Sequence, residues 1–260
     1  MIFSNSPITC YLILIIVSAC FGSFLNVVIY RLPQAINHNK SQLRAIVSPG
    51  YSSCPKCKTR LKWYHNIPIV SWLGLRGKCA FCQAKISWHY PAVELLTILV
   101  SIVVILHFST WGQAIPALLF SWILIALLFI DVQCQLLPDS LTLGLLWLGL
   151  LVNAFHLFTN PTEAILGAVV AYVLFWALNI FYLKFRGKDG LGLGDAKLFA
   201  ALLAWLGIQM LPYLLLASSL SALIVCCVLL LFKKRQYNQA FAFGPYLAIF
   251  GWILMLWLHR

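Results

Sequence analysis

The sequence predicts an all-α polytopic membrane protein of about eight transmembrane helices, with a small zinc-ribbon-like cytoplasmic insert after the first helix. Three observations support this fold class. Hydrophobic residues make up 62% of the 260 positions and charged residues only 9%, which is outside the range of ordinary soluble domains. Apolar runs recur along most of the chain, and the one large polar region carries two pairs of cysteines.

The apolar runs define the predicted spans, because crossing about 30 Å of hydrocarbon takes roughly 20 helical residues. Seven runs approach or exceed this length, and a shorter eighth run at 197–209 completes the set. The longer runs lie at 8–30, 92–110, 113–130, 141–158, 162–183, 211–232 and 242–259. The first run has little early positive charge and no convincing small-residue cleavage site, so we expect a retained helix and not a cleaved signal peptide.

The distribution of basic residues predicts the orientation. Positions 31–91 hold ten of the eighteen lysines and arginines and no acidic residue. Cytoplasmic loops beside membrane spans carry the excess of positive side chains, so this insert is expected in the cytoplasm. Counting spans from it puts loops 131–140, 184–196 and 233–241 on the same side and both termini on the other.

The formal net charge of +12 comes mainly from these loops beside the membrane spans, and no nucleic-acid motif accompanies it. Attraction to anionic membrane lipids explains such a distribution better than nucleic-acid binding does. We therefore expect lipid headgroups as partners and no nucleic acid.

Four cysteines in the insert have the spacing of a metal site. "CPKC" and "CAFC" are separated by 21 residues and supply Cys54, Cys57, Cys79 and Cys82. Each C-x-x-C turn brings two sulfurs to one side, as tetrahedral zinc requires. Two disulfides are the alternative, but cytoplasmic thiols stay reduced. The sequence thus favours a closed, structural zinc site that staples a small domain.

Carboxylates are few in this chain, and each needs a reason to be retained near a membrane. Asp139 follows Pro138 where a helix begins, so we expect it to be an N-cap. Asp131 follows an apolar run, where a negative charge opposes the helix dipole. Asp195 follows the alternating glycines of "GLGLGD", which are poor helix formers and permit unusual backbone angles and close approach of another chain. Asp131 and Asp195 are predicted on the same cytoplasmic side.

Two converging carboxylates support three interpretations. They can share one proton and activate water for peptide hydrolysis, as in aspartic proteases. They can equally form the site of a proton- or cation-coupled membrane transporter. A membrane scaffold with a zinc ribbon and no catalysis would not need them at all.

Six segments together favour the first interpretation, peptide hydrolysis by two aspartates, and point to one family. "FGSFLNVVIYRLP", "SSCPKC", "NIPIVSWLGLRGKCAFC", "ISWHYPAVE", "IDVQCQLLPDSLT" and "GLGLGDAKL" occur in this order. The chain resembles the bacterial prepilin peptidases of type IV pilus and type II secretion systems, which belong to the GxGD aspartyl peptidases. The likeness runs from about residue 21 to beyond 200.

The resemblance implies a bifunctional enzyme of the bacterial inner membrane. It would cleave the basic leader from type IV prepilins or pseudopilins on the cytoplasmic side and then methylate the new N-terminal residue with S-adenosylmethionine. The family's catalytic aspartates correspond to Asp131 and Asp195, with Gly192 and Gly194 as the supporting glycines of the motif.

The resemblance also implies a division of the chain. Residues 1–30 would be a first transmembrane helix, residues 31–91 a zinc-binding insert associated with methyl transfer, and residues 92–260 the membrane peptidase domain. The binding residues for S-adenosylmethionine are not readable from a motif. Arg76, Gly77 and Glu94 are candidates, for which loop anchoring, a turn glycine and a helix-start acid are the respective alternatives.

Overall fold

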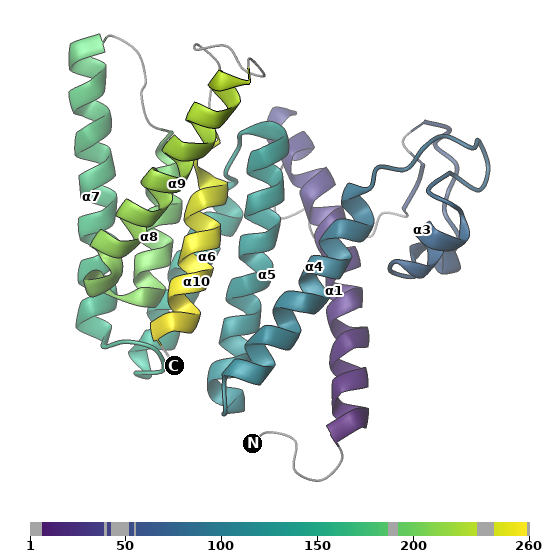
Figure 1. Ribbon diagram of the computed structural model, residues 1–260, viewed down its shortest axis with the longest axis horizontal. Coiled ribbons are helices and arrows are strands. Elements are labelled where there is room, and N and C mark those ends of the chain that lie inside the picture. Colours follow the sequence, from purple (N-terminus) through teal and green to yellow (C-terminus); the bar gives the residue numbers. More distant parts are fainter. Residues whose placement is uncertain are drawn as a thin grey trace. The chain divides into compact units, whose positions relative to one another are not determined.

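Within the described part of the chain, eight long helices coincide with the eight predicted spans. Figure 1 draws these helices in the computed structural model. The structure describes residues 7–38, 41–42, 52–54, 56–186, 192–232 and 242–258. The long helices are α1 (Pro7–Asn37), α4 (His89–His107), α5 (Trp111–Cys134), α6 (Asp139–Ala154), α7 (Pro161–Arg186), α8 (Leu193–Leu206), α9 (Leu211–Leu231) and α10 (Gly244–Leu258). The short helices η1 (Trp63–Asn66), α3 (Val70–Gly74) and η2 (Ile208–Met210) lie between them.

Five of the described helical segments are long and apolar enough to cross a membrane. They are Leu12–Asn37, His89–His107, Trp111–Cys134, Pro161–Phe185 and Ile208–Leu231. Helices α6 and α10 are shorter apolar helices, and α8 has only 14 residues. The multi-pass helical fold is confirmed, while the count of eight spans is approximate.

The first helix differs from its predicted range. Helix α1 continues from the expected end at residue 30 to Asn37 and passes through Pro33. Leu32, Pro33 and Ala35 are buried in this extension, so packing keeps it helical despite the proline. The insert therefore leaves the helix several residues later than position 31.

The chain forms two compact units, residues 1–126 and 127–260. The predicted three-part division of the chain stays a prediction. In the first unit, α1 packs closely against α4, because a Cβ added at Gly22 would lie 2.8 Å from the Cα of Glu94. Small residues allow membrane helices to approach in this way. Phe21 stacks on Trp122 of α5 at 4.1 Å, and the Trp122 indole donates to Ser101 of α4 at 2.9 Å.

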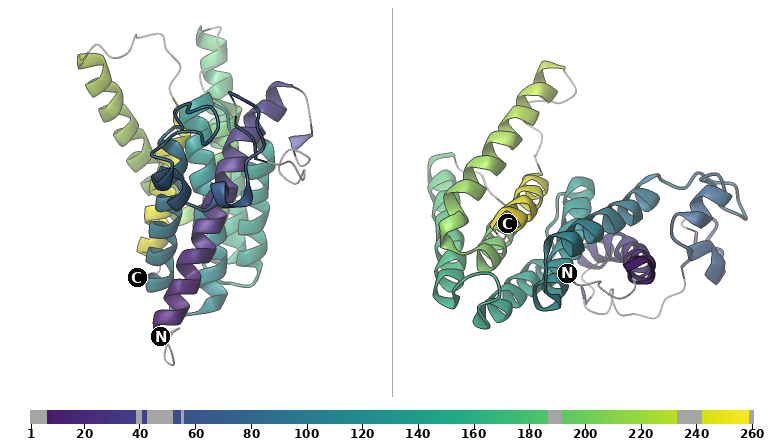
Figure 2. Two further views of the ribbon diagram at one scale, coloured as in Figure 1. Left: turned by 90° about the vertical axis from the view of Figure 1, so that its right-hand side faces the viewer. Right: turned by 60° about the horizontal axis from the view of Figure 1, so that its bottom comes forward.

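Helix α8 forms the centre of the second unit and packs against α6, α7 and α10. Its residues from Leu198 to Leu206 are all buried, as expected of a helix that is apolar on every side and enclosed by protein. Figure 2 shows α9, in lime green, diverging from α10 toward its C-terminal end. The buried residues of α9 are Leu214, Ser218 and Ala222, and none lies in its last nine residues.

Candidate functional site

Asp131 lies in the last turn of α5, where its side chain is only 4% exposed. Its backbone carbonyl accepts a hydrogen bond from Gln135, whose φ of 53° ends the helix in a left-handed turn. The backbone N–H of Gly244, at the start of α10, is directed at the carboxylate. The buried Oδ2 atom has no hydrogen-bond partner among the described residues. Such an atom needs a functional explanation, and a water molecule is a suitable partner.

Asp195 lies in the first turn of α8, with Gly192 in the cap position. Its backbone N–H donates to the Gly192 carbonyl at 3.0 Å, and its side chain is half-buried. Asp131 lies near enough for its charge to act on Asp195, so the two carboxylates are electrostatic neighbours. The second unit thus brings together two acids that are 64 positions apart in the sequence. Paired acids of this kind can divide the roles of base and acid between them.

The motif glycines make room for this arrangement. A Cβ at Gly194 would lie 2.9 Å from the Cβ of Leu137, and one at Gly192 would lie 3.2 Å from Oδ2 of Asp195. Gly192 has an ordinary extended conformation, with φ −63° and ψ 129°. Positive φ is absent at both Gly192 and Gly194, so the expectation of unusual backbone angles there is wrong. The close contacts at Gly194 and Gly192 are instead made within this chain, by Leu137 and by Asp195 itself. Gly190 lies outside the described residues.

Two further residues border the pair and escaped the sequence reasoning. Leu137 inserts between the starts of α8 and α10, since a Cβ at Gly244 would also lie 3.3 Å from its Cδ2. The same Cβ would lie 2.6 Å from Oδ2 of Asp131, so only glycine fits at position 244. The Gly-Pro pair at 244–245 before an apolar run is a helix-start signal that could have drawn attention to this segment.

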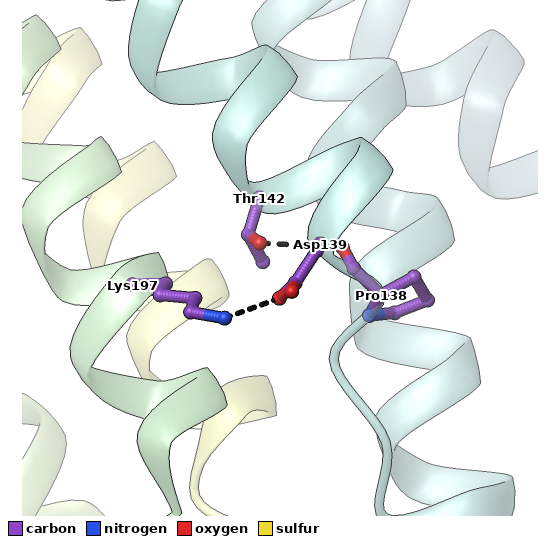
Figure 3. A network of polar contacts seen from close by, with 4 residues as sticks. All are labelled: Pro138, Asp139, Thr142 and Lys197. Atoms are coloured by element: carbon purple, nitrogen blue, oxygen red, sulfur yellow. Dashed lines mark hydrogen bonds and ion pairs between the residues drawn. The ribbon is translucent and has the colours of Figure 1, made fainter. Parts of the chain in front are cut away.

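Asp139 does not cap α6. Pro138 occupies the cap position, and Asp139 is the first residue of the helix. Its Oδ1 atom forms an ion pair with Lys197 Nζ of α8 at 2.6 Å, as Figure 3 shows beside the hydrogen bond from Thr142 to the Pro138 carbonyl. The capping prediction is therefore wrong. This ion pair links the start of α6 to the start of α8, the helix that carries Asp195.

The opposite end of α8 is fixed by a buried amide. The Asn153 side chain of α6 donates to the carbonyls of Ala204 and Trp205 at 2.8 and 3.1 Å. Its oxygen accepts from the N–H groups of Phe158 and Thr159 at 3.1 and 3.0 Å. The Asn153 amide thus donates two hydrogen bonds and accepts two. The two that it donates satisfy carbonyls at the C-terminal end of α8, which have no partner within the helix. This anchoring sets the position of the helix that carries Asp195.

The four cysteines of the insert gather into one cluster. Their sulfur atoms all lie within 4.8 Å of one another, and the Sγ atoms of Cys54 and Cys82 are 3.8 Å apart. Four sulfurs placed 2.3 Å from a central zinc ion would be about 3.8 Å apart, so the residues fit this metal. A disulfide would need about 2.05 Å, and all four cysteines are free, so the disulfide alternative is wrong.

The cluster is built from two copies of the same turn, 25 positions apart in the sequence. In the first copy Lys58 donates its N–H to Cys54 and has φ 55°, and in the second Gln83 donates to Cys79 and has φ 56°. Antiparallel bridges at Ser53–Arg60 and Lys78–Lys85 close the two turns. Each turn points two sulfurs inward, which explains why the paired C-x-x-C spacing predicts the cluster.

Hydrogen bonds in these turns favour thiolates, the form that binds metal. The side chain and backbone N–H of Thr59 lower the pKa of Cys57 to about 6. The backbone N–H groups of Cys82 and Phe81 lower the pKa of Cys79. The backbone N–H of Ala84 lowers the pKa of Cys82, but burial and the neighbouring sulfurs of Cys57 and Cys79 outweigh it and raise that pKa to about 11. A cation bound among the four sulfurs would oppose this repulsion and favour the thiolate at Cys82 as well.

The three candidate residues for S-adenosylmethionine have different environments in the structure. Arg76 is an exposed residue of a turn, with φ 50°. Gly77 is buried with φ 67°, and a Cβ there would lie 3.0 Å from the ring of Trp72, so its role as a turn glycine is supported. Glu94 is only 7% exposed and comes after the first turn of α4, so its interpretation as a helix-start acid is wrong. Of the three, only Glu94 is a buried charge.

Comparison with known proteins gives matches along nearly the whole chain. The family described as Bacterial Peptidase A24 N-terminal domain matches residues 16–108, and the Type IV leader peptidase family matches residues 118–227. A prepilin leader peptidase/N-methyltransferase of Stutzerimonas stutzeri is 42% identical over 268 residues, which cover 98% of this chain and 93% of the relative. Proteins with the same name from Aeromonas hydrophila and Pseudomonas aeruginosa are 44% and 42% identical, covering 92% and 98% of this chain and 88% and 92% of the relatives. No solved structure matches the chain.

Proposed function

The chain belongs to the type IV leader peptidase family, and from this premise we propose that Asp131 and Asp195 are the acids with which it cleaves prepilins. The family and its relatives support an enzyme of two activities, removal of the prepilin leader peptide and N-methylation, in a multi-pass inner membrane protein. They give no support to the transporter interpretation. Type IV prepilins are accordingly the substrates, with type II pseudopilins as a second substrate class that we propose from the sequence resemblance.

One observation carries the assignment of the acids. Asp131 is nearly fully buried at the end of α5, and its charge acts on Asp195 at the start of α8. Two such carboxylates are more stable when they share a proton than when both are ionised. The ionised acid takes a proton from water while the protonated acid donates to the scissile carbonyl oxygen. Water attacks the carbonyl carbon, and the amine leaves after the C–N bond breaks, so no acyl-enzyme forms.

The buried Oδ2 of Asp131 supplies the position for that water, since it has no hydrogen-bond partner among the described residues. The N-terminus of α10 faces the same carboxylate through Gly244, and a helix N-terminus stabilises negative charge. Asp131 is therefore suited to be the ionised base, and Asp195 to be the acid.

The basic insert indicates that the leader is cut on the cytoplasmic side. The insert and the two helix ends that carry the acids share one predicted side of the membrane, and anionic lipid headgroups are the expected partners of the insert's lysines and arginines. The four cysteines would hold a structural zinc ion, which joins the two turns of the insert. S-adenosylmethionine, implied by the names of the relatives, would supply the methyl group.

The test is cleavage of a detergent-solubilised prepilin, followed by mass spectrometry. Wild type should release a product lighter by the mass of the leader, and Asp131→Asn and Asp195→Asn should each lose this activity. Asp139→Asn is the matched control, because Asp139 is a nearby carboxylate that pairs with Lys197 instead. Cleavage that persists in either of the first two variants would refute the assignment.

A further inference from the structure

A pocket of about 430 Å³ opens within the first unit, between α1, the cysteine turns and the start of α4. This volume lies in the range of small-molecule sites, about 300–1,000 Å³. Cys54 and Cys79 line the pocket, so the metal cluster forms part of its wall. Val27 of α1 lines another side, and Glu94 of α4 lines it as well.

Glu94 is the only acidic residue among the first 126 positions of the sequence. Burial of a single carboxylate is costly unless it binds a cation or several donors. Arg31, Lys56 and Lys85 also line the pocket. The cavity thus offers both signs of charge, which suits a ligand that carries cationic groups and a carboxylate.

Hydrogen bonds from two segments hold the Glu94 carboxylate in place. The backbone N–H of Ile69 donates to Oε2 at 2.7 Å, and the Asn26 amide is 3.4 Å from Oε1. The same amide donates to the Tyr90 carbonyl at 3.0 Å. The Ser23 side chain is a third donor to this carboxylate. A carboxylate has about four lone-pair sites, so Glu94 can still accept from a ligand without losing these contacts.

The donor to Glu94 is itself held in a strained conformation. Ile69 has φ 60° and ψ −48°, and the Val70 N–H donates to the Pro68 carbonyl at 2.5 Å. This is the rarer, strained form of γ-turn, and it is more unusual still for a β-branched residue. Strained backbone of this kind is concentrated at ligand sites, where it places groups before the ligand binds.

Aromatic side chains supply a second type of contact. Tyr30, Trp72 and Tyr90 line the pocket. The Trp72 Nε1 atom is buried and has no hydrogen-bond partner among the described residues. A buried indole N–H ordinarily donates to an acceptor, so this atom also indicates that the pocket receives a ligand with a hydrogen-bond acceptor. Aromatic faces stack on heterocycles and attract cations.

We infer that this pocket binds the methyl donor S-adenosylmethionine, with Glu94 contacting a cationic group of the donor. The inference rests on the proposed methyltransferase function and assigns a site to it. In the reaction, the new N-terminal amine gives one proton to water, and its lone pair takes the methyl group while the C–S electron pair stays on sulfur. Glu94 is a binding residue for the donor, and the metal cluster supports the wall of its pocket.

The experiment measures equilibrium binding of S-adenosylmethionine and of S-adenosylhomocysteine to the purified, zinc-loaded enzyme. Glu94→Gln keeps the size of the side chain and removes its charge, and its binding of S-adenosylmethionine should weaken about 10- to 100-fold. Glu163→Gln is the matched control, because Glu163 accepts from Thr159 and Gln209 at 3.0 and 3.1 Å in the second unit. Its binding should equal that of wild type.

The homocysteine product, which lacks the sulfonium charge, identifies the group that Glu94 contacts. A loss confined to S-adenosylmethionine indicates the sulfonium, and an equal loss for both ligands indicates the ammonium group. Wild-type affinity in Glu94→Gln would overturn the inference.

A second variant separates binding from a structural effect of Glu94. Val27→Trp fills the pocket from α1 and leaves the residue at position 94 unchanged, and it should abolish binding while the zinc content stays unchanged. Undiminished binding in this variant would also overturn the inference. Methylation and leader cleavage by wild type are measured in parallel. Cleavage without methylation or binding means that the proposed methyltransferase function fails. Methylation and binding that both variants leave undiminished mean that only the pocket assignment fails.

Discussion

Replacing Gly244 by alanine should disable the peptidase through a single methyl group. The added Cβ would lie 2.6 Å from Oδ2 of Asp131, whereas ordinary contacts begin at 3.4 Å. The carboxylate or the start of α10 must therefore move by about 0.8 Å, because the atom in the way belongs to a buried side chain. A misplacement of about 1 Å can cost 100-fold in rate. We expect the turnover rate of leader cleavage to fall about 100-fold.

Two other glycines provide the controls, and all three variants are assayed with the same prepilin at saturating concentration. A Cβ at Gly144 of α6 meets nothing within 4 Å, so Gly144→Ala should cleave like wild type and be slightly more stable. A Cβ at Gly149 would lie 2.5 Å from the Trp205 ring, so Gly149→Ala should lower the melting temperature. Cleavage by Gly244→Ala at a rate within threefold of wild type would refute the reasoning about Asp131.

Three other changes have distinct expected results. Lys197→Ala removes a partly exposed ion pair with Asp139, so the free energy of unfolding should fall by less than about 1 kcal/mol, and a larger loss measured by chemical denaturation would contradict this. Zinc should be retained at neutral and alkaline pH and released under acidic conditions, because protons compete with the metal for the four thiolates. A metal-release titration with a colorimetric chelator checks this, and retention of zinc at pH 4 would count against it. Asn153→Ala strands two carbonyls and two N–H groups and should cost about 2–4 kcal/mol, seen as a fall in melting temperature that Asn153→Asp does not fully rescue.

The features predicted from sequence are those with strong local signals. Paired C-x-x-C turns specify where their sulfurs point, so the cysteine cluster could be predicted before its geometry was seen. The spans followed from hydrophobicity alone. Asp131 and Asp195 stood out because carboxylates beside membrane spans are costly and this chain has only six acidic residues.

The features that escaped prediction depend on contacts between distant segments. Gly244 lies 113 positions after Asp131, and a glycine offers no chemistry that marks it as part of a site. Asp139 has the local sequence pattern of a helix cap. Its carboxylate forms an ion pair instead, because α8 brings Lys197 Nζ to 2.6 Å from its Oδ1 atom. The surroundings of Glu94 depend on Ile69 and Asn26, which belong to an irregular segment and to another helix.

The joint action of Asp131 and Asp195 is tested most directly by a double-mutant cycle on leader cleavage. Residues that act as one unit have strongly non-additive effects, because loss of either one already removes the function of both. Rates are measured for wild type, Asp131→Asn, Asp195→Asn and the double variant under single-turnover conditions. The predicted result is that each single variant loses nearly all activity and the double variant is no slower than either. Independent losses that multiply in the double variant, or measurable cleavage in a single variant close to the wild-type rate, would contradict the shared two-aspartate site.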